Sequence, residues 1–135
     1  MGQQQLLLVI LAVLIIGIAI AIGVSLFTAQ SVESNRDAII DDINNLNADA
    51  YEFYIRPVSM GGGGGSFSGG VGYVIPTKMA SNDNASSYVA TIVNATQIKF
   101  VGTSAAGNGT VTNTFDASTG KVTGNYTYTG LFGSN

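Results

Sequence analysis

The sequence contains no cysteine, no histidine and no tryptophan among its 135 residues. Without cysteine, there is neither a disulfide framework nor a thiolate ligand for a metal ion. Without histidine and cysteine, the most common general bases, activated nucleophiles and transition-metal ligands are missing. We therefore expect a protein that is not an enzyme and that binds no cofactor and no metal.

Charged side chains are also scarce. They make up 10% of the residues, five basic against eight acidic, for a net charge of -3. A nucleic-acid surface needs clustered lysine and arginine side chains that displace counterions from the phosphates. The sequence contains no such cluster, so we expect no nucleic-acid partner.

What the sequence does contain is a long apolar run at residues 6–27, built almost entirely from leucine, isoleucine, valine, alanine and glycine. As a helix, these 22 residues are about 33 Å long, enough to cross the hydrocarbon of a bilayer. A cleaved secretory signal typically has a basic start and a shorter apolar core, whereas residues 1–5 here are uncharged. A plain membrane anchor remains the open alternative.

The helical pattern continues beyond the apolar run. Apolar residues recur with a period close to 3.6 up to residue 54, while carboxylates and amides occupy the opposite face. No partner side chain is placed to tune these carboxylates for acid–base chemistry, so we interpret that face as solvated. Pro57 ends the pattern. The sequence predicts one helix over residues 1–56, apolar all round in its first half and on one face in its second.

A glycine-rich connector follows at residues 57–72. It lacks the Gly-Lys-Ser/Thr ending and the following helix of a phosphate-binding loop. A mobile or tightly packed loop is therefore predicted instead of a nucleotide site.

Residues 73–135 are rich in threonine, asparagine, serine and glycine, with short β-branched and aromatic runs. This pattern predicts strands at residues 72–75, 88–93, 97–101, 110–115 and 121–129. Such a sheet has too few large apolar residues to close its own core, and the apolar stripe of the helix offers the missing face. The predicted fold is α+β: one long N-terminal helix, hydrophobic and then amphipathic, packed on a small antiparallel β-sheet head.

Two sets of residues are assigned to the contact between helix and head. Those on the helix are Ile39, Ile43, Leu46, Tyr51 and Tyr54. The aromatic layer between the two is expected to contain Tyr51, Phe53, Tyr54, Phe100, Phe115, Tyr126 and Tyr128.

With this organisation the chain resembles type IV pilins and their pseudopilin relatives. The resemblance covers the whole architecture, and its sequence-specific part is confined to the first few residues. Family precursors carry a short basic leader that ends in glycine, and a glutamate at the fifth mature position. If Met1 is the first mature residue, Gln5 occupies the glutamate position; if the cut lies between Gly2 and Gln3, the fifth residue is Leu7.

The resemblance implies a structural subunit of an extracellular helical filament, located at the cell surface. The partners would be identical copies, the membrane before assembly, and the family's pilus assembly machinery. N-terminal methylation and cell adhesion are typical of the family. The alternatives are a pseudopilin of a secretion or DNA-uptake machine and a monomeric membrane-anchored surface binding module.

Filament assembly is assigned to Met1, Gln3, Gln4, Gln5, Gly17 and Gly23. The glutamines can form an uncharged hydrogen-bonded layer between helices, or form the hydrated end of a membrane anchor at the interface. Each glycine weakens the helix by roughly 1 kcal/mol relative to alanine, but lets another helix approach closely. This segment either loses helix on assembly or packs as a straight helix.

Four Asn-x-Ser/Thr triplets begin at Asn84, Asn94, Asn108 and Asn125. In a segment this rich in asparagine, serine and threonine, chance accounts for about half of them. They are retained as weak candidates for glycosylation.

Overall fold

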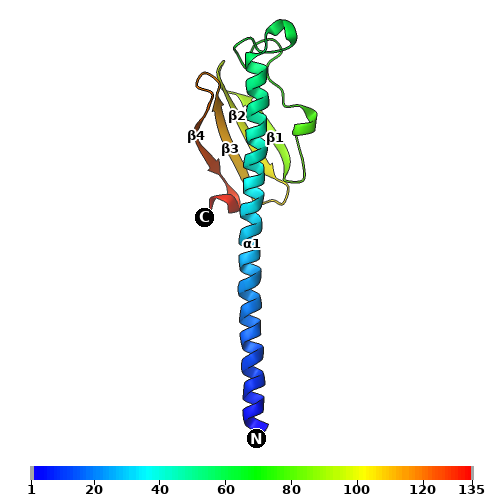
Figure 1. The fold of residues 1–135 in the computed structure, drawn as a ribbon, viewed down its shortest axis with the longest axis vertical. Helices are drawn as coiled ribbons and strands as arrows, with labels where there is room; N and C mark the ends of the chain where they lie inside the picture. Colours follow the sequence, from blue (N-terminus) through cyan, green and yellow to red (C-terminus); the bar gives the residue numbers. More distant parts are fainter. Residues whose placement is uncertain (1, 135) are drawn as a thin grey trace. The chain divides into compact units, whose positions relative to one another are not determined.

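The computed structural model describes residues 2–134, apart from the side chains of residues 121–125. The chain contains the helix α1 (Gly2–Ile55), the short 3-10 helices η1 (Val58–Met60), η2 (Thr77–Met79) and η3 (Gly130–Gly133), and the strands β1 (Ala85–Ile92), β2 (Gln97–Ser104), β3 (Thr110–Asp116) and β4 (Lys121–Tyr128) (Figure 1). The predicted α+β fold, with one long N-terminal helix and a small antiparallel sheet, is confirmed. The chain divides into two compact units, Met1–Glu33 and Ser34–Asn135, which we describe in turn.

The first unit is the N-terminal part of α1. The large apolar side chains from Leu6 to Phe27 are between 52% and 74% exposed. A helix satisfies its backbone hydrogen bonds within itself, which is what an apolar environment without water requires. Because they are exposed, the large apolar side chains from Leu6 to Phe27 are free to contact something other than their own chain.

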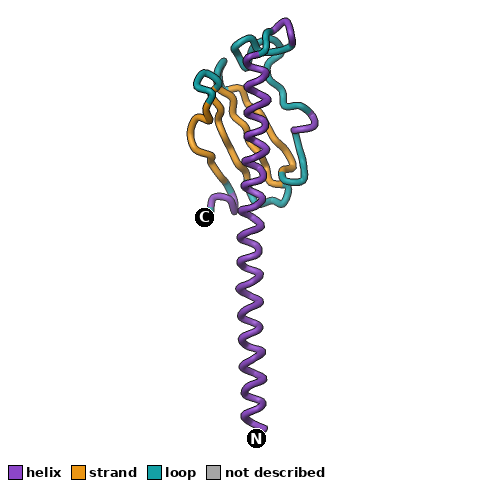
Figure 2. The backbone as a smooth tube through the Cα atoms, viewed as in Figure 1, coloured by secondary structure: helices purple, strands orange, loops and turns teal. Residues whose placement is uncertain are grey.

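The second unit, which we call the head, contains the rest of α1 and the sheet. The strands lie in the order β1-β2-β3-β4, and each neighbouring pair is antiparallel. Burial alternates along β2 and β3, so that Ile98, Phe100, Val111 and Phe115 face inward. Figure 2 shows the C-terminal part of α1 crossing this sheet.

The apolar stripe of the head helix covers the inner face of the sheet. Ile39, Ile43, Leu46 and Ala50 are almost completely buried. Burial of each large side chain stabilises the folded head by about 1.5–3 kcal/mol relative to leaving that side chain exposed. Gly102 of β2 makes room for the stripe, since a Cβ at this position would lie 2.7 Å from the Cγ2 atom of Ile39.

The glycine-rich connector closes the C-terminal end of α1. The N–H groups of Gly63 and Gly65 donate to the carbonyls of Phe53 and Tyr54, respectively, each at a distance of 2.8 Å. These are carbonyls that the end of a helix leaves without an intrahelical partner. A Cβ on Gly63 would lie 1.9 Å from the carbonyl oxygen of Ser66, so only glycine fits. Of the two kinds of loop predicted, the structure contains the tightly packed one.

The prediction of a strand at residues 72–75 is wrong, because this segment is irregular. Its Tyr73 N–H donates to the carbonyl of Phe67 at 2.9 Å, a contact with the connector and not with a neighbouring strand. β1 also begins three residues earlier than predicted. The Oδ1 atom of Asn82 accepts the N–H groups of Asn84 and Ala85, and this turn starts the strand at Ala85.

Candidate functional site: an exposed apolar helix and a head hollow

The apolar part of α1 is the first candidate site. Its most apolar 18-residue window has a mean hydropathy of 3.3, and none of it is buried inside the described structure. By length and composition it could cross a membrane. Gln3, Gln4 and Gln5 are exposed on the first turn of this helix, and Met1 lies outside the described residues.

Two glycines interrupt this apolar surface. A Cβ added to Gly17 or Gly23 would have no heavy atom within 4 Å, once the helix's own backbone is set aside. Neither glycine is therefore required by contacts within the chain. Both leave shallow places on the helix at which a second helix can approach closely.

The contact between helix and sheet is continued by aromatic side chains. Tyr51 is 41% exposed and meets Phe115 edge to face, with ring centroids 6.2 Å apart. Tyr54 packs against Phe67 of the connector, with centroids 5.2 Å apart. Phe100 and Phe115 are buried, whereas Phe53, Tyr54, Tyr126 and Tyr128 are half-buried.

Phe67 and Tyr73 were missed by the sequence reasoning, although both are buried. Tyr73 meets Phe100 at a centroid distance of 6.0 Å, and Phe67 meets Phe115 at 6.3 Å. Their position in the sequence could have indicated their burial, since an aromatic ring within or beside a glycine run seldom stays in water.

Asp42 anchors the loop before β1 to the helix. Its Oδ2 atom accepts hydrogen bonds from Tyr88 (2.5 Å), Asn82 (2.7 Å) and Asn84 (3.2 Å). Burial raises the pKa of Asp42, but these three hydrogen bonds outweigh it and hold the pKa below its ordinary value. For Tyr88, burial and then the Asp42 carboxylate both raise the pKa of the phenol.

A second tyrosine–carboxylate pair joins Tyr73 to Asp49. The Tyr73 hydroxyl donates to Oδ2 of Asp49 at 2.7 Å. Burial, followed by this hydrogen bond, raises the pKa of Tyr73. The Tyr73 pair holds the loop preceding β1 on the helix, and the Tyr88 pair holds β1 itself; in both, the phenol stays protonated at neutral pH.

Asn35 joins the helix to the ends of three strands. Its Nδ2 donates to the carbonyl of Asn84 at 3.0 Å, and its Oδ1 accepts from Ser104 (2.6 Å) and Asn108 (3.2 Å). The side-chain nitrogens of Asn84 and Asn108 are therefore engaged within the head. By contrast, Asn94 is exposed at the β1–β2 turn, where its Nδ2 donates to Gln97. The side chain of Asn125 lies outside the described residues.

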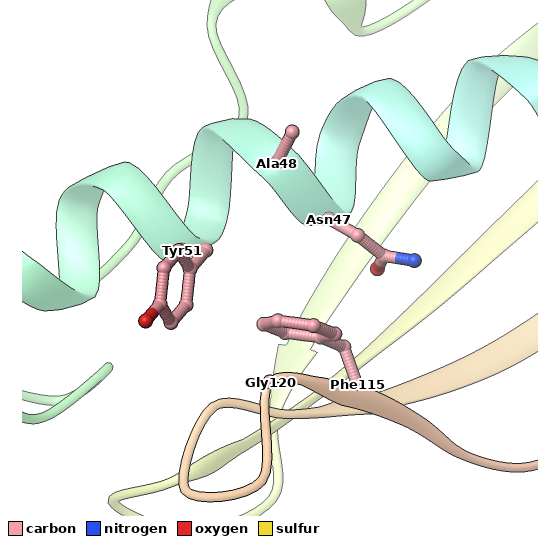
Figure 3. Close-up of a pocket in the computed structure, with 5 residues that line it drawn as sticks. All are labelled: Asn47, Ala48, Tyr51, Phe115 and Gly120. Carbon is pink, nitrogen blue, oxygen red and sulfur yellow. The ribbon is translucent and has the colours of Figure 1, made fainter.

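The head also has an apolar hollow of about 310 Å³ between α1 and the end of the β3–β4 hairpin. It is lined by Asn47, Ala48, Tyr51, Phe115 and Gly120 (Figure 3). Figure 3 shows the Tyr51 ring and the Asn47 amide extending from the helix on either side of Phe115.

Beside this hollow, two buried asparagines meet across the helix–sheet contact. Nδ2 of Asn47 donates to Oδ1 of Asn113 at a distance of 3.4 Å, near the upper limit for a hydrogen bond. The two side chains are 6% and 2% exposed, and among the described residues Oδ1 of Asn47 and Nδ2 of Asn113 have no partner. No pattern in the sequence indicates this pairing, because it depends on how the helix lies on the sheet.

Within the part of the chain that the structure describes, no group of three or more His, Cys, Asp or Glu side chains could hold a metal ion. No family model, no curated protein and no solved structure matches the chain.

Proposed function

We propose that the protein is a structural subunit of a type IV pilus-like helical filament outside the cell. The apolar helices of many copies form the dry core of this filament, and the β heads form its surface. The observation that carries the proposal is the uncovered apolar surface of α1 between Leu6 and Phe27.

Burial of that surface explains both a membrane stage and a polymer. In a bilayer, lipid covers the side chains, and helices gain little hydrophobic free energy from one another. Outside the bilayer, the same side chains face water unless other copies cover them. Transfer of α1 from the membrane into a bundle of identical helices keeps the surface buried throughout. The assembly machinery of the pilin family would supply the work of extraction.

The uncharged start of α1 agrees with such a buried position. A charge isolated in an apolar bundle is costly, whereas an amide can both donate and accept hydrogen bonds. Gln5, with Gln3 and Gln4, would form a neutral layer where the family has a glutamate. The filament would then be held together at its centre without an ion pair.

Electron microscopy of material sheared from the surface of the producing cells tests the proposal. We expect fibres, and mass spectrometry should identify this chain as their main component. If the chain is abundant in the membrane and no fibre contains it, the filament proposal fails. The N-terminal peptide in the same spectrum also distinguishes a start at Met1 from a start at Gln3, and a free from a methylated amine.

The hollow beside Tyr51 and Phe115 favours a second candidate, a membrane-anchored binding module that acts as a monomer. Such a protein would remain in the membrane fraction after shearing. A pseudopilin would instead give short assemblies that stay attached to the cell envelope. The length and location of the assemblies therefore separate the three candidates.

A further inference from the structure

The turn between β1 and β2 holds the side chain of Asn94 in a defined orientation. Its Oδ1 atom accepts three hydrogen bonds: from the N–H of Thr96 (2.9 Å), from the hydroxyl of Thr96 (3.1 Å) and from the N–H of Gln97 (2.9 Å). Its Nδ2 atom donates to Oε1 of Gln97 at 3.1 Å. Gln97 is itself oriented by Asp116, whose Oδ2 atom accepts from Nε2 of Gln97 at 3.0 Å. These contacts fix the two ends of the Asn94 amide.

The backbone of this turn is also anchored to the rest of the head. The carbonyl of Ala95 accepts the N–H of Phe67, and the carbonyl of Thr96 accepts the N–H of Ala117, each at 2.8 Å. Asn94 and Ala95 are nevertheless exposed. The head therefore presents the amide to solvent on an ordered turn, and no local unfolding is needed to expose it.

Three donors on one oxygen change the reactivity of the amide. An amide nitrogen is a poor nucleophile, because its lone pair is delocalised onto the carbonyl. When Nδ2 loses a proton, negative charge moves onto Oδ1, where hydrogen-bond donors stabilise it. Thr96 and Gln97 therefore favour the loss of a proton from Nδ2 as this nitrogen attacks an electrophilic carbon.

The Asn-x-Ser/Thr triplet at Asn84 is arranged differently. Nδ2 of Asn84 donates to the Asp42 carboxylate at 3.2 Å. The hydroxyl of Ser86, the third residue of this triplet, donates to the carbonyl of Thr103 at 3.4 Å. The amide nitrogen is thus engaged within the head, and the hydroxyl points to a neighbouring strand.

The triplet at Asn108 is also engaged within the head. Nδ2 of Asn108 donates to Oδ1 of Asn35 at 3.2 Å, and the hydroxyl of Thr110 pairs with that of Thr129 at 2.6 Å. Among the triplets whose asparagine side chain the structure describes, Asn94 alone receives the hydroxyl of its own triplet. The structure therefore distinguishes triplets that the sequence pattern treats as equal.

The reaction that fits this amide is the transfer of a glycan. An exposed Asn-x-Ser/Thr triplet is the acceptor pattern for N-linked glycans. The donor class is a glycan joined through a diphosphate to a membrane lipid. By its length and composition α1 could cross a membrane, so the chain and such a donor can occupy the same bilayer.

We propose that Asn94 carries an N-linked glycan. The inference rests on one part of the proposed function, a head that lies outside the cell, and does not require a filament. In the transfer step, Nδ2 of Asn94 attacks the anomeric carbon of the glycan. A C–N bond forms, the C–O bond to the lipid diphosphate breaks and leaves its electron pair on the diphosphate, and one Nδ2 proton passes to a base of the transferring enzyme.

The product is compatible with the observed turn. The glycosylated amide keeps one N–H and an unchanged Oδ1 atom. Among the described residues, Gln97 is the one acceptor that Nδ2 of Asn94 contacts, so the sugar can replace the other hydrogen without breaking a hydrogen bond. Attachment of the glycan therefore should not destabilise the head.

Mass spectrometry of the chain isolated from its producing cells tests the assignment. Cleavage after lysine and arginine places the four triplets on three peptides: residues 79–99 with Asn84 and Asn94, residues 100–121 with Asn108, and residues 122–135 with Asn125. We expect sugar masses on the first peptide, and fragmentation that preserves the sugar should place them on Asn94. Absence of sugar from Asn94, whatever the other triplets carry, would overturn the inference.

Variants of the turn test the chemistry separately from the fold. Asn94→Asp keeps an oxygen that can accept the three hydrogen bonds but lacks the nitrogen, so the glycan should be lost while the head stays folded. Thr96→Ser keeps the hydroxyl and should keep the glycan. Thr96→Ala loses one hydrogen bond to Oδ1 and should lower the occupancy of the site about tenfold or more.

The matched control is Ser86→Ala, which removes the hydroxyl of the Asn84 triplet and should leave the glycan on residues 79–99 unchanged. Near-ultraviolet circular dichroism of the tyrosines verifies that each variant is folded. Full occupancy in a folded Thr96→Ala variant would overturn the inference, because the turn would then not activate the amide.

The outcomes also separate this inference from the proposed filament. A glycan at Asn94 on a chain that forms no fibres supports the inference and contradicts the filament. Fibres whose subunits carry no sugar at Asn94 overturn the inference and leave the filament proposal unaffected. If protease added to intact cells does not reach the head, both proposals fail.

Discussion

The two halves of α1 have the same backbone structure but differ in what covers their apolar side chains. From Leu6 to Phe27 the large apolar side chains are exposed on all sides of the helix, whereas Ile39, Ile43 and Leu46 are buried against the sheet. In the second half, the chain supplies its own cover through β2 and β3. In the first half the described part of the chain supplies no such cover, and the proposed function assigns it to lipid and to other copies. The comparison locates the packing of the head in the second half of the helix and leaves the first half to the proposed assembly.

Truncation of an isoleucine to alanine should distinguish the two halves of α1 most clearly, because it should destabilise the head only in the second half. Ile43→Ala leaves a cavity in the head and should lower its free energy of unfolding by about 2–5 kcal/mol. Ile15→Ala should leave that free energy unchanged, because Ile15 is exposed. Denaturant titration of the full chain in a mild detergent, followed by near-ultraviolet circular dichroism of the tyrosines, measures both. A similar loss in the two variants would contradict the division of roles.

Glycines in the two halves should also respond in opposite directions. Gly63→Ala places a Cβ against the Ser66 carbonyl, and we expect it to destabilise the head by about 1–3 kcal/mol. Gly17→Ala meets no atom and should raise the helix propensity by roughly 1 kcal/mol without affecting the head. Thermal unfolding of the full-length variants provides the measurement. A head that tolerates alanine at position 63 would show that the connector is not a required cap.

The neutral start of the apolar half gives the third prediction. Gln5→Leu should impair assembly while leaving membrane insertion intact, because leucine cannot pair with the amides of neighbouring copies. Loss of one buried hydrogen bond costs about 1 kcal/mol, so the fibre yield should fall about fivefold. Gln30→Leu, the same change on an exposed residue beyond the apolar run, is the control. Unchanged yield for Gln5→Leu would place this residue outside the filament centre.

The smallest effect is expected in acid, and only in the head. The pKa of Asp42 is lowered from its model-compound value of 3.8, so its contribution to stability is present above that value and is lost as the pH falls through the folded-state pKa. The head should therefore be less stable below about pH 4, and Asp42→Asn should reduce this dependence. Asp83→Asn, in the same loop, serves as the control. Stability measured between pH 2 and 7 checks this, and equal acid sensitivity of all three proteins would contradict it.

At alkaline pH the same head should respond through Tyr73 and Tyr88. Their pKa values are raised from 10.0, so their contribution is complete below pH 10 and is lost as the pH rises further. Spectrophotometric titration of the full chain at 295 nm should show that the phenols of Tyr73 and Tyr88 ionise only when the head unfolds. Ionisation of every tyrosine near pH 10 in the folded protein would contradict the buried pairs.

Local patterns predicted most of this fold because hydrophobic periodicity reports directly on which face is buried. The long helix and the four strands that the structure contains were found in this way, with boundaries shifted by a few residues. The connector was harder, because its conformation depends on backbone clashes that no periodicity records. Gly63 is required by Ser66, and Phe67 is held by the carbonyl of Ala95. The strand wrongly predicted at residues 72–75 has the same cause.

The candidate site divides in a similar way. The apolar surface of α1 could be recognised from composition alone. The hollow could not, since it forms only when Tyr51 on the helix is brought beside Phe115 and Gly120 on a hairpin that is distant in sequence.

The buried pair Asn47 and Asn113 has a consequence for how the head can misfold. If the helix slid along the sheet by one turn, about 5.4 Å, an apolar side chain would lie against Asn113 and Asn47 would face apolar neighbours. Even the weak hydrogen bond of 3.4 Å would then be lost, and all the polar atoms of both amides would be buried without partners. A purely aliphatic stripe has no such means of rejecting a shifted alignment. The two asparagines thus disfavour shifted alignments of the helix on the sheet and favour the observed one.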